Sequence, residues 1–149
     1  MCTVKLSSME KEFVPYELAV KLKELGFDGF TRFHINRNNE LNTISESPFS
    51  MFQYNMEPNE DDTDSLVAAP TFSQAFRWFR EKYRMFHEVF IDTEPTVDEP
   101  DKLEFTYIVL HMVGMEEMHT SKNKRFKTYE EAELACLDKL LEIVESESK

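Results

Sequence analysis

Hydrophobic positions between residues 71 and 86 recur with the period of an α-helix. The segment opens with T-F-S-Q at residues 71–74, a capping-box pattern in which Gln74 reaches back to the cap. At about 100° per residue, the apolar side chains of the following turns collect into an arc of core-facing width. This arc consists of Phe72, Ala75, Phe76, Phe79, Tyr83 and Phe86. A separate stripe consists of Arg77, Arg80 and Arg84, and nearly opposite the apolar arc lie Trp78 and Met85.

Two other stretches alternate with the period of a β-strand. Residues 29–36 alternate along their whole length, while residues 103–113 are amphipathic at first and then apolar on both faces. The second pattern predicts a central position in a sheet, because a central strand is covered on both sides. We expect residues 87–92 and part of residues 115–127 to add neighbouring strands.

A first helix is predicted over residues 16–25. Pro15 is suited to a helix start, and Gly26 is suited to the position just after a helix end. Leu18, Leu22 and Leu25 lie on one face of this helix and predict its buried side.

The last helix begins after a second capping box, T-Y-E-E at residues 128–131. Its apolar residues cover more than one narrow stripe. One side carries Tyr129, Ala132, Cys136, Leu140 and Ile143, and the other carries Leu134, Leu137, Leu141 and Val144. A helix this apolar must contact two surfaces, so we expect it to pack on the sheet and on another helix or a partner subunit. A homodimer through this helix is one outcome of that pattern.

Together these elements predict an α+β fold. We expect an antiparallel sheet of about four strands, with three helices mainly on one face, in a single domain over residues 1–149. Residues 1–12 and 146–149 are expected to fray, and residues 55–66 to form an acidic loop. The intervening residues 37–70 have the weakest pattern, and we expect one or two edge strands there.

Length and cysteine content limit the class of protein. A chain of 149 residues buries roughly two thirds of its unfolded surface and folds without disulfide staples. Its two cysteines, Cys2 and Cys136, form no disulfide framework, which favours a reducing compartment. No segment approaches the roughly 18 apolar residues of a membrane span, and the first residues lack a signal-peptide pattern. We therefore expect a cytoplasmic protein with no membrane partner.

The charge is strongly negative and unevenly distributed. Seventeen Lys and Arg against 29 Asp and Glu give a formal charge of −12, which disfavours general binding to nucleic acid or anionic membranes. Residues 57–64 carry five acids and no base, and residues 88–104 carry seven acids and only Lys102. Between them, residues 65–87 hold four bases against the lone Glu81.

The sequence contains no recognisable catalytic constellation. There is no G-x-S-x-G nucleophile turn, and the three glycines are too scattered for a phosphate-binding loop. Cys136 lies on an apolar arc, where a cysteine behaves as a small hydrophobic residue. We expect no catalytic residues, no cofactor and no enzymatic activity.

Two clusters raise the question of a metal. His111 and His119 flank two glutamates in H-M-V-G-M-E-E-M-H, but the spacing does not place both histidines on one helical face. In the acidic run, counting from Asn59, the sixth and twelfth positions of a calcium loop hold Asp64 and Pro70 instead of Gly and Glu. We therefore expect no metal site.

A partner surface is the remaining candidate for function. Trp78 and Met85, beside the stripe of Arg77, Arg80 and Arg84, have the composition found at interface hot spots. The alternative is that residues 37–70 fold over Trp78 and bury it. Both remain open from the sequence.

Nucleic acid and its mimicry are further alternatives. Residues 122–127 (K-N-K-R-F-K) are basic, and the order helix, strands, helix over residues 71–145 resembles a double-stranded-RNA-binding domain. The glutamates in the first turn of the last helix would repel phosphates. Conversely, the net charge would allow the chain to mimic the acidic surface of a nucleic acid.

Three stretches resemble one family. They are F-V-P-Y-E-L-A-V-K-L-K-E-L-G-F-D at residues 13–28, A-P-T-F-S-Q-A-F-R-W-F-R-E-K-Y at residues 69–83 and Y-E-E-A-E-L-A-C-L-D-K-L-L-E-I-V at residues 129–144. They are similar to a family of small uncharacterised proteins of gut Bacteroidales genomes, phages and mobile elements. The resemblance implies an accessory protein of phage or mobile-element origin and supplies no site residues. We expect a non-enzymatic interaction or regulatory protein whose partner is a protein.

Overall fold

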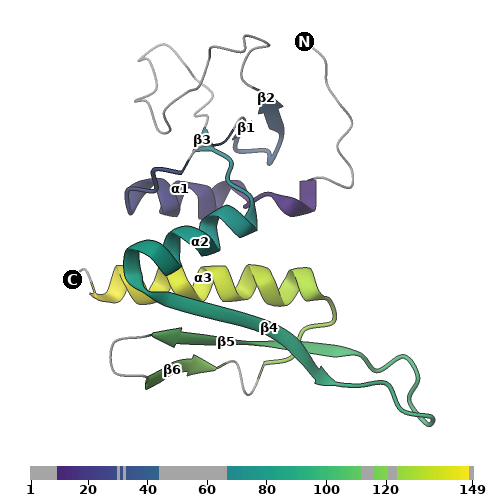
Figure 1. Ribbon diagram of the computed structural model, residues 1–149. Coiled ribbons are helices and arrows are strands. Elements are labelled where there is room, and N and C mark those ends of the chain that lie inside the picture. The colour runs from purple at the N-terminus through teal and green to yellow at the C-terminus, as the bar shows by residue number, and fades with distance from the viewer. Residues whose placement is uncertain are drawn as a thin grey trace. The chain divides into compact units, whose positions relative to one another are not determined.

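The computed structural model describes residues 10–29, 31, 33–43, 67–111, 116–120 and 124–147. The chain divides into two compact units, Met1–Ala75 and Phe76–Lys149, with the division inside one helix. In chain order the elements are η1 (Glu10–Glu12), α1 (Tyr16–Glu24), β1 (Phe33–Ile35), β2 (Leu41–Thr43), β3 (Val67–Ala68), α2 (Phe72–Tyr83), β4 (Met85–Thr93), β5 (Glu104–His111), β6 (Glu116–Thr120) and α3 (Tyr129–Glu147) (Figure 1).

The predicted α+β class is confirmed, but the single sheet of about four strands is wrong. The described residues form two antiparallel sheets of three strands, ordered β2-β1-β3 and β4-β5-β6. Alternation along a chain identifies a strand without identifying its pairing partner. The expectation of a single domain stays a prediction, since two compact units can belong to one domain.

In the first unit, α1 has the predicted start and end. It follows Pro15 and buries Leu18, Ala19 and Leu22. Gly26 follows the helix with φ 80°, a backbone conformation that favours glycine, and the next amide donates to the Leu22 carbonyl at 2.9 Å. The turn between β1 and β2 contributes the cap at the other end, because Asn39 Oδ1 accepts from the Tyr16 amide at 2.8 Å.

In the second unit, β5 is central, as its pattern predicts. It pairs with β4 from Met85↔His111 to Thr93↔Glu104, and with β6 on its other side. The register with β4 shifts between Ile91 and Thr93, so Asp92 lies at a bulge. Helix α3 contacts β4 and β5 and covers one face of this sheet.

The α2 capping box is confirmed. The Thr71 amide donates to Gln74 Oε1 at 2.9 Å, and the Gln74 amide donates to Thr71 Oγ1 at 3.2 Å. These two bonds satisfy donors that the first helical turn leaves free.

The end of α2 differs from the prediction. The helix ends at Tyr83, Arg84 adopts φ 53°, and β4 begins at Met85. Placing Phe86 on the apolar arc of the helix was therefore wrong. One left-handed residue redirects the backbone, and from there on side chains alternate with a period of two.

The capping of α3 departs from the simple box by one residue. Thr128 Oγ1 accepts from the Glu131 amide at 3.2 Å, whereas the Glu131 carboxylate accepts from the Lys127 amide at 3.1 Å. Both bonds still satisfy backbone donors at the start of the helix.

The wide apolar arc of α3 is largely buried within the single chain. Its buried residues are Ala132, Cys136, Leu137, Leu140, Leu141, Ile143 and Val144. Only Tyr129 and Leu134, at 44% and 37% exposure, remain open in its first turns. A homodimer through this helix, one of the outcomes that the sequence allowed, would therefore lack a continuous exposed apolar face.

The fraying expected at residues 1–12 and 146–149 concerns segments that the structure describes only in part. Residues 1–9, 148 and 149 lie outside the described residues, while α3 continues to Glu147. The acidic loop expected at residues 55–66 also lies outside them. The expectation of one or two edge strands over residues 37–70 is confirmed, because β2 and β3 form the two edges of the first sheet. No helix among those described is long and apolar enough to cross a membrane.

Candidate functional site

The structure buries the two apolar members of the predicted partner surface. Trp78 is 7% exposed and Met85 is 1% exposed. The Trp78 ring lies edge-on to Phe79 and Tyr83, with centroids 5.1 and 5.3 Å away, and Lys82 Nζ lies 4.7 Å from its centroid. Neither residue offers a large exposed contact area in this structure.

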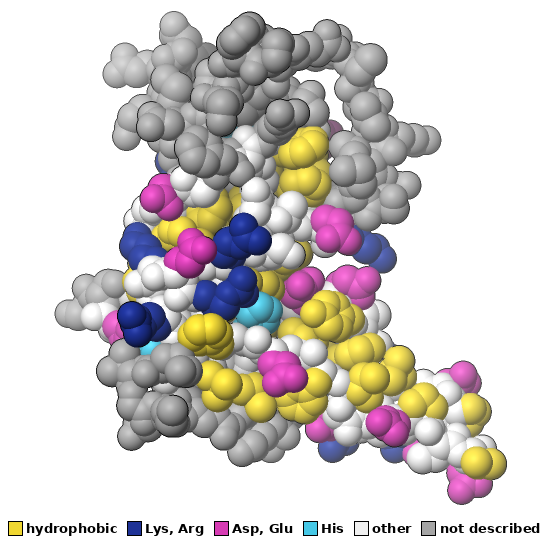
Figure 2. All heavy atoms as spheres, viewed as in Figure 1, with side chains coloured by type: hydrophobic (Ala, Val, Ile, Leu, Met, Phe, Trp, Pro, Cys, Tyr) yellow, Lys and Arg dark blue, Asp and Glu magenta, His cyan; other side chains and the backbone are white. Residues whose placement is uncertain are grey.

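The three arginines of that surface remain accessible. Arg77 and Arg84 are exposed and Arg80 is half-buried. None of them forms an ion pair in the part of the chain that the structure describes. Figure 2 shows Lys and Arg side chains gathered over α2 and the start of β4. This patch is unusual in a chain with 12 surplus negative charges.

Arg84 has an unfavourable backbone conformation for its residue type. Its φ of 53° lies in the left-handed region, where a Cβ atom costs roughly 1 kcal/mol or more relative to glycine. Two basic residues in the last turn of this helix, Arg80 and Lys82, interact favourably with the negative end of the helix dipole and so stabilise the helix. That role does not explain an arginine at a position that suits glycine.

The face of the second sheet away from α3 was not among the partner surfaces predicted from the sequence. Phe86 pairs with Leu110 across β4 and β5, and Glu88 pairs with Ile108. Phe86 is 40% exposed and Leu110 is 38% exposed. We call this surface, made by Phe86, Glu88, Phe90, Ile108 and Leu110, the open sheet face.

The opposite face of the same strands is the one that α3 covers. Met85, Tyr107 and Val109 are buried there. Burial raises the pKa of Tyr107, and so, less strongly, do Cys136, Glu142 and Asp138 of α3, which places this side chain near the helix. Since neighbouring strand residues point to opposite faces, Phe86 and Leu110 must point away from α3.

One sequence signal does point to the open sheet face. The later part of residues 103–113 is apolar on both faces, and residues 86 and 90 add alternate phenylalanines in the neighbouring strand. The first pattern by itself predicts burial on both sides. The structure covers one side with α3 and leaves Leu110 on the other side exposed.

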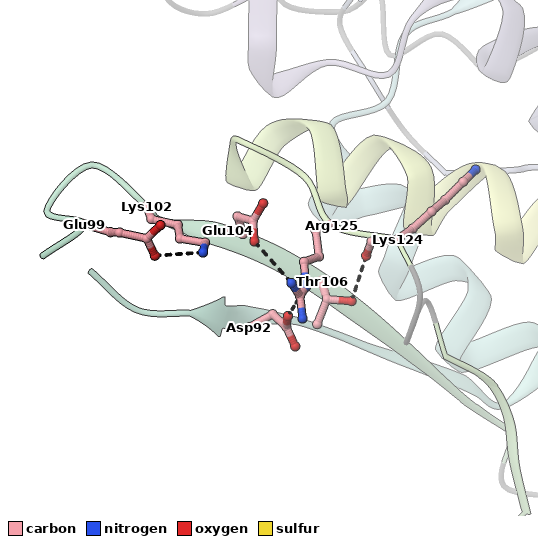
Figure 3. Close-up of polar contacts among 7 residues, drawn as sticks. All are labelled: Asp92, Glu99, Lys102, Glu104, Thr106, Lys124 and Arg125. Carbon is pink, nitrogen blue, oxygen red and sulfur yellow. Dashed lines mark hydrogen bonds and ion pairs between the residues drawn. The ribbon is translucent and has the colours of Figure 1, made fainter. Parts of the chain in front are cut away.

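The basic stretch at residues 122–127 has a structural role where it is described. Arg125 Nε lies 2.7 Å from Asp92 Oδ2, and Arg125 Nη1 lies 3.7 Å from Glu104 Oε2 (Figure 3). Phe126 exchanges two backbone hydrogen bonds with Phe105, at 2.8 and 2.9 Å. The stretch thus pairs with β5, and its arginine is already engaged by carboxylates.

Acidic groups dominate the connection between β4 and β5. Glu94, Asp98, Glu99 and Asp101 are exposed there, and Lys102 Nζ forms an ion pair with Glu99 Oε2 at 2.8 Å. Hydrophobic and acidic side chains are interspersed along β4 and this connection in Figure 2. The open sheet face therefore has an acidic border.

Burial keeps two histidines, His34 and His87, largely in their neutral form. Burial, and then the positive charge of Arg80, lower the pKa of His87 to about 4, so its imidazole is neutral near pH 7. Burial also lowers the pKa of His34. The described residues contain no group of three His, Cys, Asp or Glu side chains placed to hold a metal ion.

The buried thiol of Cys136 is not activated. Burial, followed by the charge of Glu133, raises its pKa to about 12. A protonated thiol is a weak nucleophile, and the side chain is fully buried. The acidic run at residues 57–64 lies outside the described residues, as do the side chains of Glu116, Glu117 and His119.

Comparison of the chain with protein-family models, with curated proteins and with solved structures gave no match.

Proposed function

We propose that this chain is a non-enzymatic interaction protein, an accessory or regulatory factor of a phage or mobile element, that binds a protein partner through the open sheet face. One observation carries the proposal. Phe86 and Leu110 lie directly opposite each other on neighbouring strands and are 40% and 38% exposed. The family resemblance of residues 69–83 and 129–144 supports the accessory role.

The open sheet face has the makeup of an interface centre. Aromatic side chains are enriched at such centres, and burying a Phe or Leu side chain fully is worth about 1.5–3 kcal/mol. Because these two are already partly covered, each would contribute a fraction of that amount on binding. Phe90 and Ile108, both half-buried, extend the apolar area along the same strands.

The charges around this face indicate the chemistry of the partner. Glu88 lies on the face, and the exposed acids of residues 94–101 border it. A partner with an apolar centre and a rim of Lys or Arg would complement both features. Proteins that bind nucleic acid have such basic surfaces, so mimicry of nucleic acid is a special case of this proposal.

The test is a comparison of matched variants. Tagged wild-type chain and the double variant F86S/L110S are used to isolate partners from host cells, and each enriched protein is then purified and titrated. The control V97S removes a fully exposed valine, at 99% exposure, from the connection outside the open sheet face. We expect wild type and V97S to bind the purified partner alike and F86S/L110S to bind at least about tenfold more weakly. Equal affinities for all three chains would refute the proposed face.

A second candidate function is binding of nucleic acid through Arg77, Arg80 and Arg84. The observation that favours it is the absence of ion pairs to these arginines among the described residues, together with the order α2, β4, β5, β6, α3. The engaged Arg125 and the acidic connection between β4 and β5 weigh against it. Gel-shift titration with double-stranded RNA and DNA at low salt decides between the two functions.

A further inference from the structure

The outer edge of β4 lacks a partner strand among the described residues. On one side β4 pairs with β5 along nearly its full length. On its other side no strand pairs with it among the residues that the structure describes. With nine residues, β4 is also the longest described strand. An edge of this length presents a row of backbone donors and acceptors to any extended chain.

The two ends of β4 carry opposite charges. Arg84 directly precedes the strand, whereas Glu94 directly follows it, beyond Asp92, which is already paired with Arg125. If two copies of such a strand pair antiparallel, the positive end of each meets the negative end of the other. The edge of β4 is therefore complementary in charge to a second copy of itself.

The charge pattern also selects one register. Two-fold antiparallel pairing about Glu88 places this carboxylate opposite its own copy, and pairing about Phe90 places Glu88 opposite Asp92; both arrangements oppose like charges. Pairing about Val89 places Glu88 opposite Phe90 and brings Arg84 toward Glu94.

Two further points favour pairing about Val89. It engages the strand from residue 85 to residue 93, with the bulge at Asp92 near each end, whereas a centre at His87 uses only the first five residues of β4. Residues 87–91, which precede the bulge at Asp92, form a regular ladder in this arrangement.

We propose that two copies of this chain associate by antiparallel pairing of their β4 edges about Val89. The two three-stranded sheets then form one continuous sheet of six strands, with β4 beside β4 at its centre. Paired residues share a face, so α3 of each copy stays on one side and the two open sheet faces adjoin on the other. The contact is confined to one strand from each copy, which predicts a weak, concentration-dependent dimer opposed by the net charge of each chain.

The first test is charge exchange at the ends of the strand, followed by sedimentation of the full chain over a range of concentrations. We expect Arg84→Glu and Glu94→Arg each to weaken dimerisation roughly tenfold, because the symmetry repeats every unfavourable pair twice. The double variant R84E/E94R is expected to restore it.

Glu94→Arg is the decisive single variant in this series. It lowers the net negative charge and would favour association if only general repulsion mattered. Lys102→Glu, in the connection between β4 and β5, makes the same change of charge as Arg84→Glu; it is the matched control for that variant and is expected to change dimerisation little. A monomer at all concentrations, or a double variant no better than either single variant, would overturn the proposal.

Disulfide trapping tests the register independently. In a Cys2→Ser background, V89C brings two thiols together at the two-fold axis, whereas E88C places its thiol opposite Phe90. Mild oxidation is expected to cross-link V89C and to leave E88C largely monomeric. Equal cross-linking of both variants would contradict the register. A negative result here leaves the F86S/L110S binding comparison intact, so failures of the two proposals are distinguishable.

Discussion

The ring of Phe76 in α2 stacks on the imidazole of His87 in β4, with centroids 3.5 Å apart and planes 11° from parallel. This contact connects the helix to the strand across the tight connection at Arg84. It also removes water from one face of the imidazole, which disfavours the charged form. Burial, with Arg80 as the second cause, lowers the pKa of His87 to about 4.

The stack predicts a pH dependence of stability. Because the pKa of His87 falls from 6.5 to about 4 on folding, the unfolded chain binds the extra proton between these values. The free energy of unfolding should therefore fall as pH drops from 6.5 toward 4, with a slope of up to about 1.4 kcal/mol per pH unit, and this contribution should level off below. Urea unfolding at several pH values should show a flatter dependence for His87→Phe, which keeps a flat ring. Parallel curves for both chains would contradict the assignment.

The left-handed residue between α2 and β4 predicts an unusual effect of glycine. Arg84→Gly and Arg84→Ala both remove the guanidinium group, but only glycine relieves the cost of φ 53°. We expect the glycine variant to be more stable than the alanine variant by about 1 kcal/mol in urea unfolding. Equal stabilities would indicate that the left-handed conformation is absent in solution.

The capping box of α2 predicts that removing a single atom, Thr71 Oγ1, lowers the stability of the chain. Thr71→Ala removes the hydroxyl that accepts from the Gln74 amide and should lower the free energy of unfolding by about 1 kcal/mol. Ser73→Ala, at an exposed position in the same turn, is the control and should stay within about 0.5 kcal/mol of wild type. If the two variants lose the same amount, the box does not cap α2.

Burial of Cys136 predicts an inert thiol. With a pKa of about 12, roughly one thiol in ten thousand is ionised at pH 8, and the side chain is fully buried. In a Cys2→Ser background, a thiol reagent should modify the folded chain only as fast as it unfolds and the urea-unfolded chain at once. Modification of the folded chain at the rate of a free cysteine would contradict this environment.

The elements that the sequence predicted correctly are those with local causes. Thr71 with Gln74, and Gly26 after α1, act over a few residues, so their spacing alone indicates where each helix begins or ends. The end of α2 was missed because the left-handed position holds Arg84 instead of glycine. From that residue onward the helical period was applied to a strand, which placed Met85 and Phe86 on the wrong surfaces.

The open sheet face was missed for a different reason. Apolar residues on both faces of β5 do not reveal how many layers cover the sheet. The number of covering layers depends on residues that are distant in the sequence. Arg77 and Arg84 were predicted as exposed surface and are exposed. The sequence did not decide whether Trp78 is exposed or buried. In the structure it is buried, and its ring contacts the rings of Phe79 and Tyr83.

Hydroxyl-radical oxidation of the native chain, read by mass spectrometry, tests the open sheet face most directly. The structure predicts rapid oxidation of Phe86, at 40% exposure, and protection of Phe76 and Phe79, at 2% and 0%. Addition of a purified protein partner should then protect Phe86 and Leu110 while the oxidation of Val97 stays unchanged. A Phe86 as protected as Phe79 in the free chain, or one that the bound partner leaves fully reactive, would contradict the account.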